Sequence, residues 1–315
     1  MGQRDTTENQ TGHSAASDRA TRRVTILVPY LWLTLFFLVP FAIVAKMSLS
    51  QVATAVPPYE PVFGLGDGFS GWRDKLGQLS FGNYGVVTGD ALYIDAFVSS
   101  LRIAAIGTAI LLLIGYPMAQ AMARAPERLR PLLVMAVILP FWTSFLIRVY
   151  AWIGILKPEG LLNELLLGLG LIGTRLQIAN TEAAVLIGVV YSYLPFMVLP
   201  LYAALERLDR TLLEAAADLG CSPIGAFWRI TVPLTLPGII AGCFLCFIPI
   251  TGEVVIPDLL GGSETLMIGK TLWTEFFANR DWPVASAVAV LLLIVLVGPI
   301  MIYQHLQARQ LEAIR

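Results

Sequence analysis

The chain has 315 residues, of which 57% are apolar and only 14% are charged, and its mean hydropathy is +0.73. Soluble globular proteins carry about 25% charged residues, so this composition excludes an ordinary soluble domain. The formal net charge of −1 gives no support for nucleic-acid binding, and the long apolar segments predict an all-α polytopic membrane protein.

The N-terminal region is expected to be a tail followed by a first membrane span. Residues 1–23 are polar and predict a disordered cytoplasmic tail. The apolar run from Val24 to Ala45 is long enough to cross a hydrocarbon layer of ~30 Å as a helix. A signal peptide cleaved near Ala53-Thr54-Ala55 is the competing interpretation. Signal-peptide apolar cores are shorter, about 7–15 residues, so the sequence favours an uncleaved span.

Five further apolar segments bring the predicted number of spans to six. They are residues 94–122, 131–156, 181–205, 236–256 and 283–303. Gly115 and Pro117 predict a break in the second span. A short helix is expected near Asn83 and Tyr84, in the long loop before that span, and a shallow helix is expected in the loop at 157–180.

The placement of positive charge predicts the orientation. Six spans would place both termini and every second loop on the same side of the membrane. Most of the 21 Lys and Arg residues lie in these segments, and the longer loops on the other side hold fewer. Positive charge marks the cytoplasmic side. Both termini and the loop at 211–233 are therefore expected in the cytoplasm, with 24–305 as the transmembrane domain and 306–315 as a cytoplasmic tail.

The loop at 211–233 carries its own helix signals. Glu214-Ala215-Ala216-Ala217-Asp218-Leu219 predicts a short helix and Gly220 its end. Ser222-Pro223 reads as the cap and first residue of a second helix. An amphipathic surface helix would explain Glu-Ala-Ala alone, but a helix-turn-helix between two membrane spans has more internal order than a plain connector needs.

The spacing within this loop resembles the loop signature of permease subunits in binding-protein-dependent ABC importers. Glu214-Ala215-Ala216 is followed after three residues by Gly220, after nine more by Ile230, and then by Val232-Pro233. Val232 stands where that family usually has Leu. The resemblance implies that the first loop helix docks into a groove on a cytoplasmic ATPase. The expected coupling residues are Glu214, Ala215, Ala216, Asp218 and Gly220.

The sequence offers no constellation for an enzyme active site. There are two His residues and three Cys residues, so a metal centre or a His-based triad is not expected. Gly269-Lys270-Thr271 looks like the end of a phosphate-binding loop, but the Gly that such a loop needs five positions earlier is Glu264. No cofactor is expected in this chain, and ATP and Mg are expected on a separate ATPase subunit.

Ionisable residues at membrane depth are costly and mark partners or pathways. Glu253 lies in the fifth span, where Pro249 and Gly252 predict a kinked or unwound helix. Glu253 is a natural counter-charge for a cationic solute. The alternative is a structural ion pair between Glu253 and Arg148 or Arg102, and the sequence leaves both open.

Aromatic residues of the third span are the other pathway candidates. Trp142 and Tyr150 could hold an alkyl-ammonium group through cation–π contact, worth ~0.5–2 kcal/mol each. An interfacial aromatic belt is the alternative, and it is favoured for Trp152. The expected pathway residues are Glu253, Trp142, Tyr150, Arg148 and Asp258.

Beyond the loop, the chain resembles permeases of spermidine/putrescine ABC importers, closest to the putrescine branch, over roughly residues 24–305. The matching segments begin at Leu139 (LPFWTSFLIRVYAWI), Tyr193 (YLPFMVLPLYAALE), Gly252 (GEVVIPDLLGG) and Ile268 (IGKTLWTEFFANRDWPVASAVAV). Val254 departs from the branch, which often has Phe there.

This resemblance implies a type I ABC importer permease of the bacterial inner membrane. The implied partners are two ATPase subunits, a second and different homologous permease, a periplasmic polyamine-binding protein and the lipid bilayer. An opine or another cationic amino-acid-like solute is the alternative substrate, and a proton-coupled secondary transporter is the alternative class.

Overall fold

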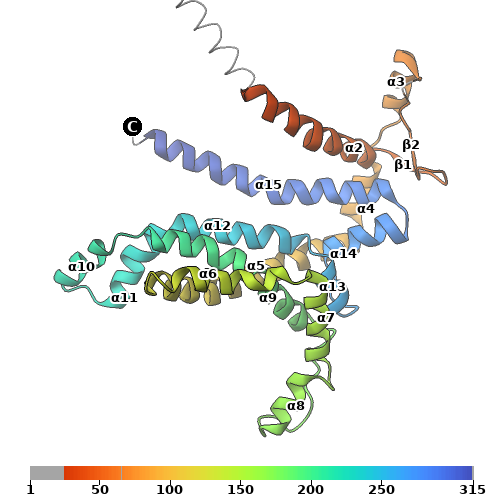
Figure 1. Cartoon of the computed structure of the whole chain (residues 1–315). Coiled ribbons are helices and arrows are strands. Elements are labelled where there is room, and N and C mark those ends of the chain that lie inside the picture. Colours follow the sequence, from red (N-terminus) through yellow and green to blue (C-terminus); the bar gives the residue numbers. More distant parts are fainter. Residues whose placement is uncertain (1–24, 65, 314–315) are drawn as a thin grey trace, which may run out of the picture. The chain divides into compact units, whose positions relative to one another are not determined.

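The computed structural model describes residues 25–64 and 66–313, and over this range its regular secondary structure is helical apart from one short hairpin (Figure 1). The chain divides into two compact units. One holds Met1–Val86 with Arg280–Leu293, and the other holds Val87–Asn279 with Ile294–Arg315. The predicted disordered tail, residues 1–23, lies outside the described residues.

The first unit begins with an apolar helix, Thr25–Ser48. This helix passes through a π-helical turn, η1 (Thr34–Leu38), and ends as α2 (Val39–Ser48). A two-stranded antiparallel hairpin follows, in which β1 (Gln51–Val52) pairs with β2 (Tyr59–Glu60). Helices α3 (Gly68–Gly77) and α4 (Gly82–Gly89) come next, and α4 confirms the short helix predicted near Asn83 and Tyr84.

Polar contacts tie the end of α2 to the hairpin and to α4. The Lys46 ammonium lies 4.3 Å from the centroid of the Tyr59 ring and 5.1 Å from that of Phe63, and it donates a hydrogen bond to the carbonyl of Pro61. The Asn83 amide donates to the carbonyls of Ser48 and Ser50, at 2.8 and 2.7 Å. The bond to Ser48 satisfies a backbone carbonyl that the end of α2 leaves unpaired.

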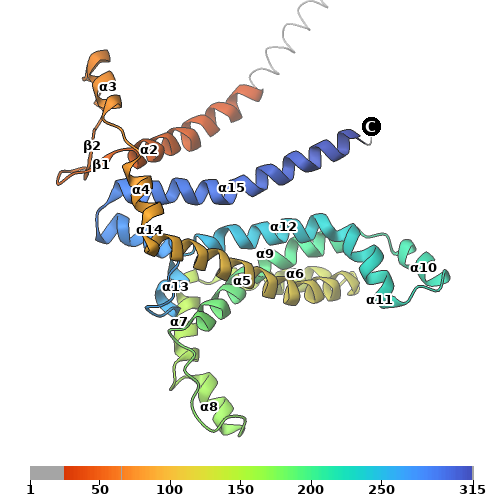
Figure 2. The same ribbon diagram turned by 180° about the vertical axis from the view of Figure 1, so that it is seen from behind.

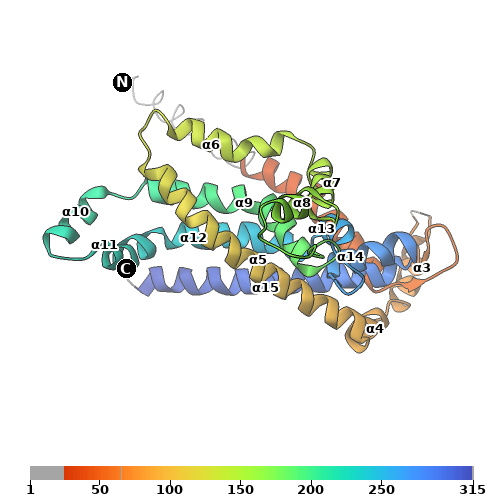
Figure 3. The same cartoon turned by 90° about the horizontal axis from the view of Figure 1, so that it is seen from below.

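The second unit is built on three long helices that pack side by side: α5 (Ala91–Arg124), α9 (Glu182–Glu206) and α12 (Val232–Thr251). Figure 2 shows this bundle from behind and Figure 3 from below, with α6 (Arg130–Ile138) running beside it. Side-chain caps define the starts of two of these helices. Asp90 accepts from the Leu92 amide at 2.9 Å, and Thr181 accepts from the Ala184 amide at 3.4 Å.

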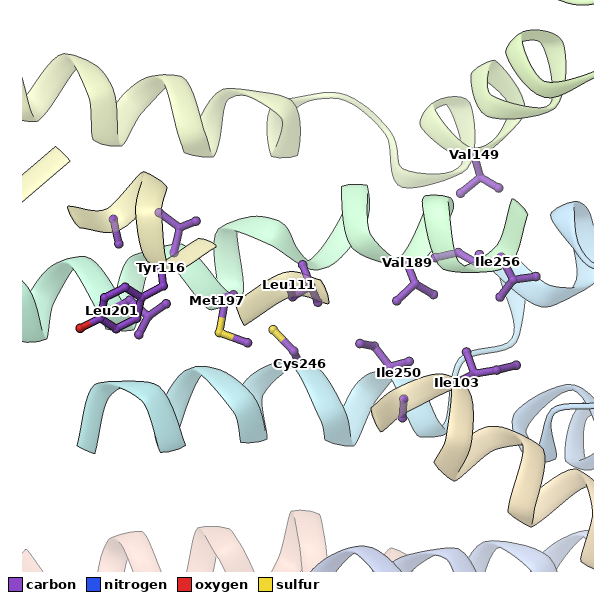
Figure 4. Close-up of a cluster of buried hydrophobic side chains, with 14 of the residues drawn as sticks. Ile103, Leu111, Tyr116, Val149, Val189, Met197, Leu201, Cys246, Ile250 and Ile256 are labelled. Carbon is purple, nitrogen blue, oxygen red and sulfur yellow. The ribbon is translucent and has the colours of Figure 1, made fainter. Parts of the chain in front are cut away.

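The core of this unit is a continuous apolar cluster centred on α5, α9 and α12 (Figure 4), and it also includes Val149, Leu156, Ile256 and Leu260. Helices surrounded by lipid gain little from burial of apolar surface and associate through close packing, which small residues allow. Gly238 and Gly242, four residues apart on α12, provide that approach to α9. A Cβ added at Gly238 would lie 2.5 Å from the Ala204 Cβ, and one at Gly242 would lie 2.9 Å from the Met197 Sδ.

The predicted break in the second span is wrong, because α5 continues through both Gly115 and Pro117. Gly115 is buried against α9 instead, where an added Cβ would lie 2.9 Å from the Met197 Cγ. Packing against α9 therefore outweighs the loss of one backbone hydrogen bond at Pro117.

The predicted third span is not one helix but two, bent by 87°. Helix α6 runs into a 3₁₀ turn, η2 (Leu139–Trp142), and α7 (Phe145–Leu156) starts after a two-residue break. Pro140 cannot donate a helical hydrogen bond, and Thr143 and Ser144 have extended ψ angles of 152° and 133°. Helix α8 (Leu161–Gly168) follows and confirms a helix in the loop at 157–180.

The rest of the second unit includes α13 (Val255–Leu260), α14 (Ile268–Trp273) and the π-helical turn η4 (Thr274–Ala278). The last helix, α15 (Trp282–Ala313), extends through residues 306–313, which the sequence assigned to a tail. The described residues hold four long apolar helices, the bent pair and the shorter apolar segment Trp282–Gly298. The all-α membrane fold is confirmed, whereas the six-span count and the location of the termini stay predictions.

Candidate functional site

The loop between α9 and α12 folds as the helix-turn-helix that its sequence predicts. Helix α10 (Arg210–Asp218) is capped by Asp209, whose side chain accepts from the Thr211 amide at 3.0 Å. Helix α11 (Pro223–Ala226) is capped by Ser222, which accepts from the Gly225 amide at 3.2 Å. The loop lies at one end of the α5–α9–α12 bundle, opposite α13 and α14 (Figure 1).

The turn between the two loop helices is a Schellman motif. The Cys221 amide donates to the carbonyl of Ala216 and the Gly220 amide to that of Ala217, both at 2.9 Å. Gly220 has a φ of +75°, which a residue without a Cβ adopts at no steric cost. This glycine therefore sets the direction in which the chain leaves α10.

Most of the expected coupling residues on α10 are exposed. Ala216 is buried, whereas Glu214, Ala215 and Asp218 are exposed, and Glu214 also borders a cavity beside the bundle. Large apolar side chains are also exposed on this loop, with Leu219 at 88% and Ile224 at 74% of full exposure. Apolar exposure of this size on a polar loop fits a docking surface.

At the other end of the bundle, the fifth predicted span is interrupted where Glu253 lies. Helix α12 ends at Thr251 and α13 starts at Val255, which confirms the predicted unwinding next to Gly252. Glu253 is 9% exposed. Its Oε1 accepts from the amides of Val254, Val255 and Ile256 at 3.1–3.4 Å, and its Oε2 accepts from the Tyr193 hydroxyl at 2.5 Å.

Neither predicted ion pair of Glu253 is present among the described residues. Arg102 pairs with Glu182 instead. Arg148 is buried at 9% exposure, and its Nε and Nη1 atoms have no hydrogen-bond partner in the described part of the chain. Glu253 is thus a buried carboxylate held by neutral donors, since the break in the backbone turns three amides toward it.

A row of aromatic rings connects the two buried charged residues. The Arg148 guanidinium lies 5.0 Å from the centroid of the Phe141 ring. Phe141 packs edge-on against Phe196 at 5.2 Å, and Phe196 lies 6.0 Å from Tyr193, which donates to Glu253. Phe196 and Tyr193, both on α9, thus lie between the segment that holds Phe141 and the break after α12. Their contacts arise because helices that are distant in sequence pack together.

The other predicted pathway residues lie at more exposed positions. Trp142 and Tyr150 are 76% and 54% exposed, respectively. Asp258 forms an ion pair with Lys270 at 3.3 Å, and its side chain is 59% exposed. Trp152 packs edge-on against Tyr191 at 5.4 Å. Of the predicted set, Glu253 and Arg148 are therefore the two buried members.

Replacing Arg148 with Met is expected to stabilise the detergent-purified chain by about 1–3 kcal/mol, the usual cost of a buried polar group without a partner. Met keeps an apolar stem of similar length beside Phe141 and Phe145 and leaves no unpaired N–H. The thermal unfolding midpoint measures this effect. Arg102→Met is the control, since Arg102 is exposed and paired. A midpoint lowered by Arg148→Met would contradict the observed lack of a partner.

Comparison with known proteins places this arrangement in a family. Residues 11–311 match the model of the "Binding-protein-dependent transport system inner membrane component" family. A spermidine/putrescine transport system permease protein PotB from Salmonella typhimurium is 47% identical over 214 residues, covering 68% of this chain and 75% of that protein. PotB from Haemophilus influenzae is 39% identical over 282 residues, covering 90% and 92%.

The fold is also similar to that of a solved ABC transporter. The structure of a bacterial alginate ABC transporter, in complex with an alginate pentasaccharide-bound periplasmic protein, has a chain with a TM-score of 0.66. The match covers 93% of this chain and 96% of that chain at 17% sequence identity. At this identity the likeness concerns the fold alone.

Proposed function

The chain belongs to the binding-protein-dependent transport system inner membrane component family, and on that premise we propose that it is the permease subunit of an ATP-driven polyamine importer. It is a transport protein and not itself an enzyme, and it is a multi-pass protein of the bacterial inner membrane. Spermidine/putrescine transport is the activity named for its PotB relatives, which are 39–47% identical.

The observation that carries the coupling part of this proposal is the loop of α10 and α11. It is a capped helix-turn-helix between two apolar helices, with exposed Leu219 and Ile224. Such a rigid, partly apolar projection fits a groove on a cytoplasmic ATPase and would carry the movement of that ATPase to the spans. Glu214, Ala215, Ala216, Asp218 and Gly220 are the residues to which we assign this coupling.

The remaining partners follow from the same proposal. Two ATPase subunits would hold ATP and Mg, and a second permease would complete the membrane pathway. A periplasmic binding protein would deliver the polyamine, in keeping with the binding-protein-dependent systems to which the family belongs. The cytoplasmic side of the loop is required by this scheme and agrees with the distribution of positive charge.

Within the membrane, we assign the ammonium of the solute to Glu253. The carboxylate is buried and has no cationic partner among the described residues, so a cation that reaches it gains a strong interaction in a medium of low polarity. The row of rings Phe141, Phe196 and Tyr193 offers aromatic faces beside it. Trp142, Tyr150, Arg148 and Asp258 complete the assigned route.

Uptake of radiolabelled putrescine by cells carrying the complete transporter tests this function. Wild-type cells are expected to accumulate the label, and Glu214→Lys is expected to abolish accumulation while the chain still reaches the membrane, because the coupling helix then carries the opposite charge. Competition by unlabelled spermidine, but not by an opine, supports the polyamine assignment. No uptake of either polyamine would overturn the solute, and uptake that persists without ATP would favour a secondary transporter.

A further inference from the structure

A polar cavity of about 660 Å³ lies between the loop helix α10 and the adjoining ends of α5 and α9. Its charged lining residues are Arg124, Glu127, Arg130, Glu206 and Glu214. A second cavity of about 190 Å³ continues beside α11 and touches Arg124 together with Leu213 and Ala217 of α10. The coupling helix therefore faces open space on the side turned toward the spans.

One cation of the cavity is already engaged. Arg130 lies 3.5 Å from Glu206 and donates from its Nε to the Ala125 carbonyl at 3.0 Å. Glu206 also accepts from the Tyr202 hydroxyl at 2.7 Å. These contacts fix Arg130 and Glu206 to the bundle, and neither group is available to α10 without breaking them.

Two opposite charges across the cavity are not engaged. Within the described part of the chain, Glu214 on α10 and Arg124 at the last residue of α5 have no ion pair. Arg124 lines both cavities, which it shares with Leu213, Glu214 and Ala217 of α10. The C-terminal end of a helix also favours a cation, so the position of Arg124 at the end of α5 is a favourable one.

We infer that Arg124 is the partner of Glu214 within the same chain, and that their ion pair forms when α10 moves toward the bundle and the cavity narrows. Arg124 is thus a positioning residue that ties the coupling helix to the end of α5. The inference rests on the proposed function, since it concerns how movement of the loop reaches a span. It gives Glu214 a partner on the cavity side of α10, in addition to the coupling assigned to this loop helix.

Glu127 is the other acid without an ion pair in the described lining of this cavity, but it cannot play the same part. It follows Arg124 by three residues in the short loop after α5, so the two move together and their separation does not report the width of the cavity. Glu214 is on the opposite wall. An attraction between Arg124 and Glu214 therefore changes with the position of α10, and that dependence is what coupling requires.

Charge exchange tests the pair in the complete transporter. Glu214→Arg and Arg124→Glu are each expected to lower putrescine uptake on the order of tenfold or more, and the double variant is expected to recover to within about threefold of wild type. Arg128→Glu is the matched control, because Arg128 lies in the short loop just after Arg124, is exposed and lines neither cavity. Uptake by this variant should stay at the wild-type level. A double variant that reaches the membrane but transports no better than the single variants would overturn the inference.

A double-mutant cycle with neutral substitutions tests the same pair if the charge-reversed variants fail to assemble. Glu214→Gln and Arg124→Gln are each expected to lower uptake, and together they should lower it no further than either alone, whereas multiplying losses would contradict the pair. Arg124→Lys should retain uptake, since it keeps the charge. A wild-type transporter that takes up no putrescine would refute the proposed function. Wild-type uptake with neither recovery in the charge-exchanged double variant nor non-additive losses in the Gln variants would refute only the pair.

Discussion

Glu253→Gln is expected to lower putrescine uptake at least about tenfold while the protein still folds and assembles. The Gln carbonyl oxygen can replace Oε1 as acceptor for the amides of Val254, Val255 and Ile256. Its NH₂ group can donate to the Tyr193 hydroxyl in place of the bond that Tyr193 now donates. The substitution removes the negative charge. The solute ammonium then loses a hydrogen bond to a charged group, which is worth about 1.5–3 kcal/mol.

Two further variants make this result specific. Glu253→Ala removes the charge and the acceptor together, so it should lower the thermal unfolding midpoint as well as uptake, because three buried amides lose their partner. Glu264→Gln neutralises an exposed acid in the loop after α13 and should transport normally. Normal uptake by Glu253→Gln would show that this carboxylate only caps the backbone and does not meet the solute.

The second large effect is expected at Gly269, in the first turn of α14. A Cβ added there would lie 2.4 Å from the Gly252 carbonyl oxygen and 2.6 Å from that of Glu253. Both contacts are to backbone, which cannot rotate away as a side chain can. Gly269→Ala is therefore expected to push α14 off the break between α12 and α13, to destabilise the chain by about 1–3 kcal/mol, and to abolish uptake through displacement of Glu253.

Gly154→Ala is the matched control for Gly269→Ala. Gly154 lies in α7, and an added Cβ there would meet no atom within 4 Å. Ala in a helix interior is more stable than Gly by roughly 0.5–1 kcal/mol, so this variant should unfold at the same temperature as wild type or slightly higher and should transport normally. Equal thermal stability of the two variants would contradict the close packing of α14 on the break.

The loop of α10 and α11 could be predicted from sequence because its signals are local. Gly220 at a positive φ, the Ser222 cap and Pro223 at the first helical position each act within a few residues. The unwinding next to Gly252 is similar, since Pro249 and Gly252 weaken the helix wherever it packs. In both cases the residue types determine the backbone with little help from the rest of the fold.

The remaining features depend on contacts between distant segments. Gly115 and Pro117 predict a break, yet packing of α5 against Met197 keeps the helix continuous. Tyr193 is 60 residues from Glu253, and nothing in either segment identifies the other as its partner. The same holds for Gly269, whose sequence context suggests a phosphate loop, whereas the structure shows a close approach of two backbones. The sequence identifies these residues as unusual, but it does not reveal which residues they contact.

Arg148 illustrates the limit of charge matching from sequence. Glu253 and Arg148 are both ionisable groups at membrane depth, so an ion pair is a reasonable expectation. In the structure, three backbone amides and a hydroxyl already hold Glu253, and two aromatic rings flank Arg148. The backbone amides at the break are free to donate to Glu253 only because α12 ends at Thr251 and a new helix, α13, begins at Val255.

The most direct test of the proposed function is putrescine uptake into proteoliposomes that contain this chain with its second permease, its ATPase and its binding protein. We expect labelled putrescine to accumulate only when the binding protein is on the side opposite the ATPase and ATP is supplied to the ATPase, and spermidine to compete. Accumulation without ATP, or ATP-dependent accumulation of another solute that polyamines do not reduce, would contradict an ATP-driven polyamine permease.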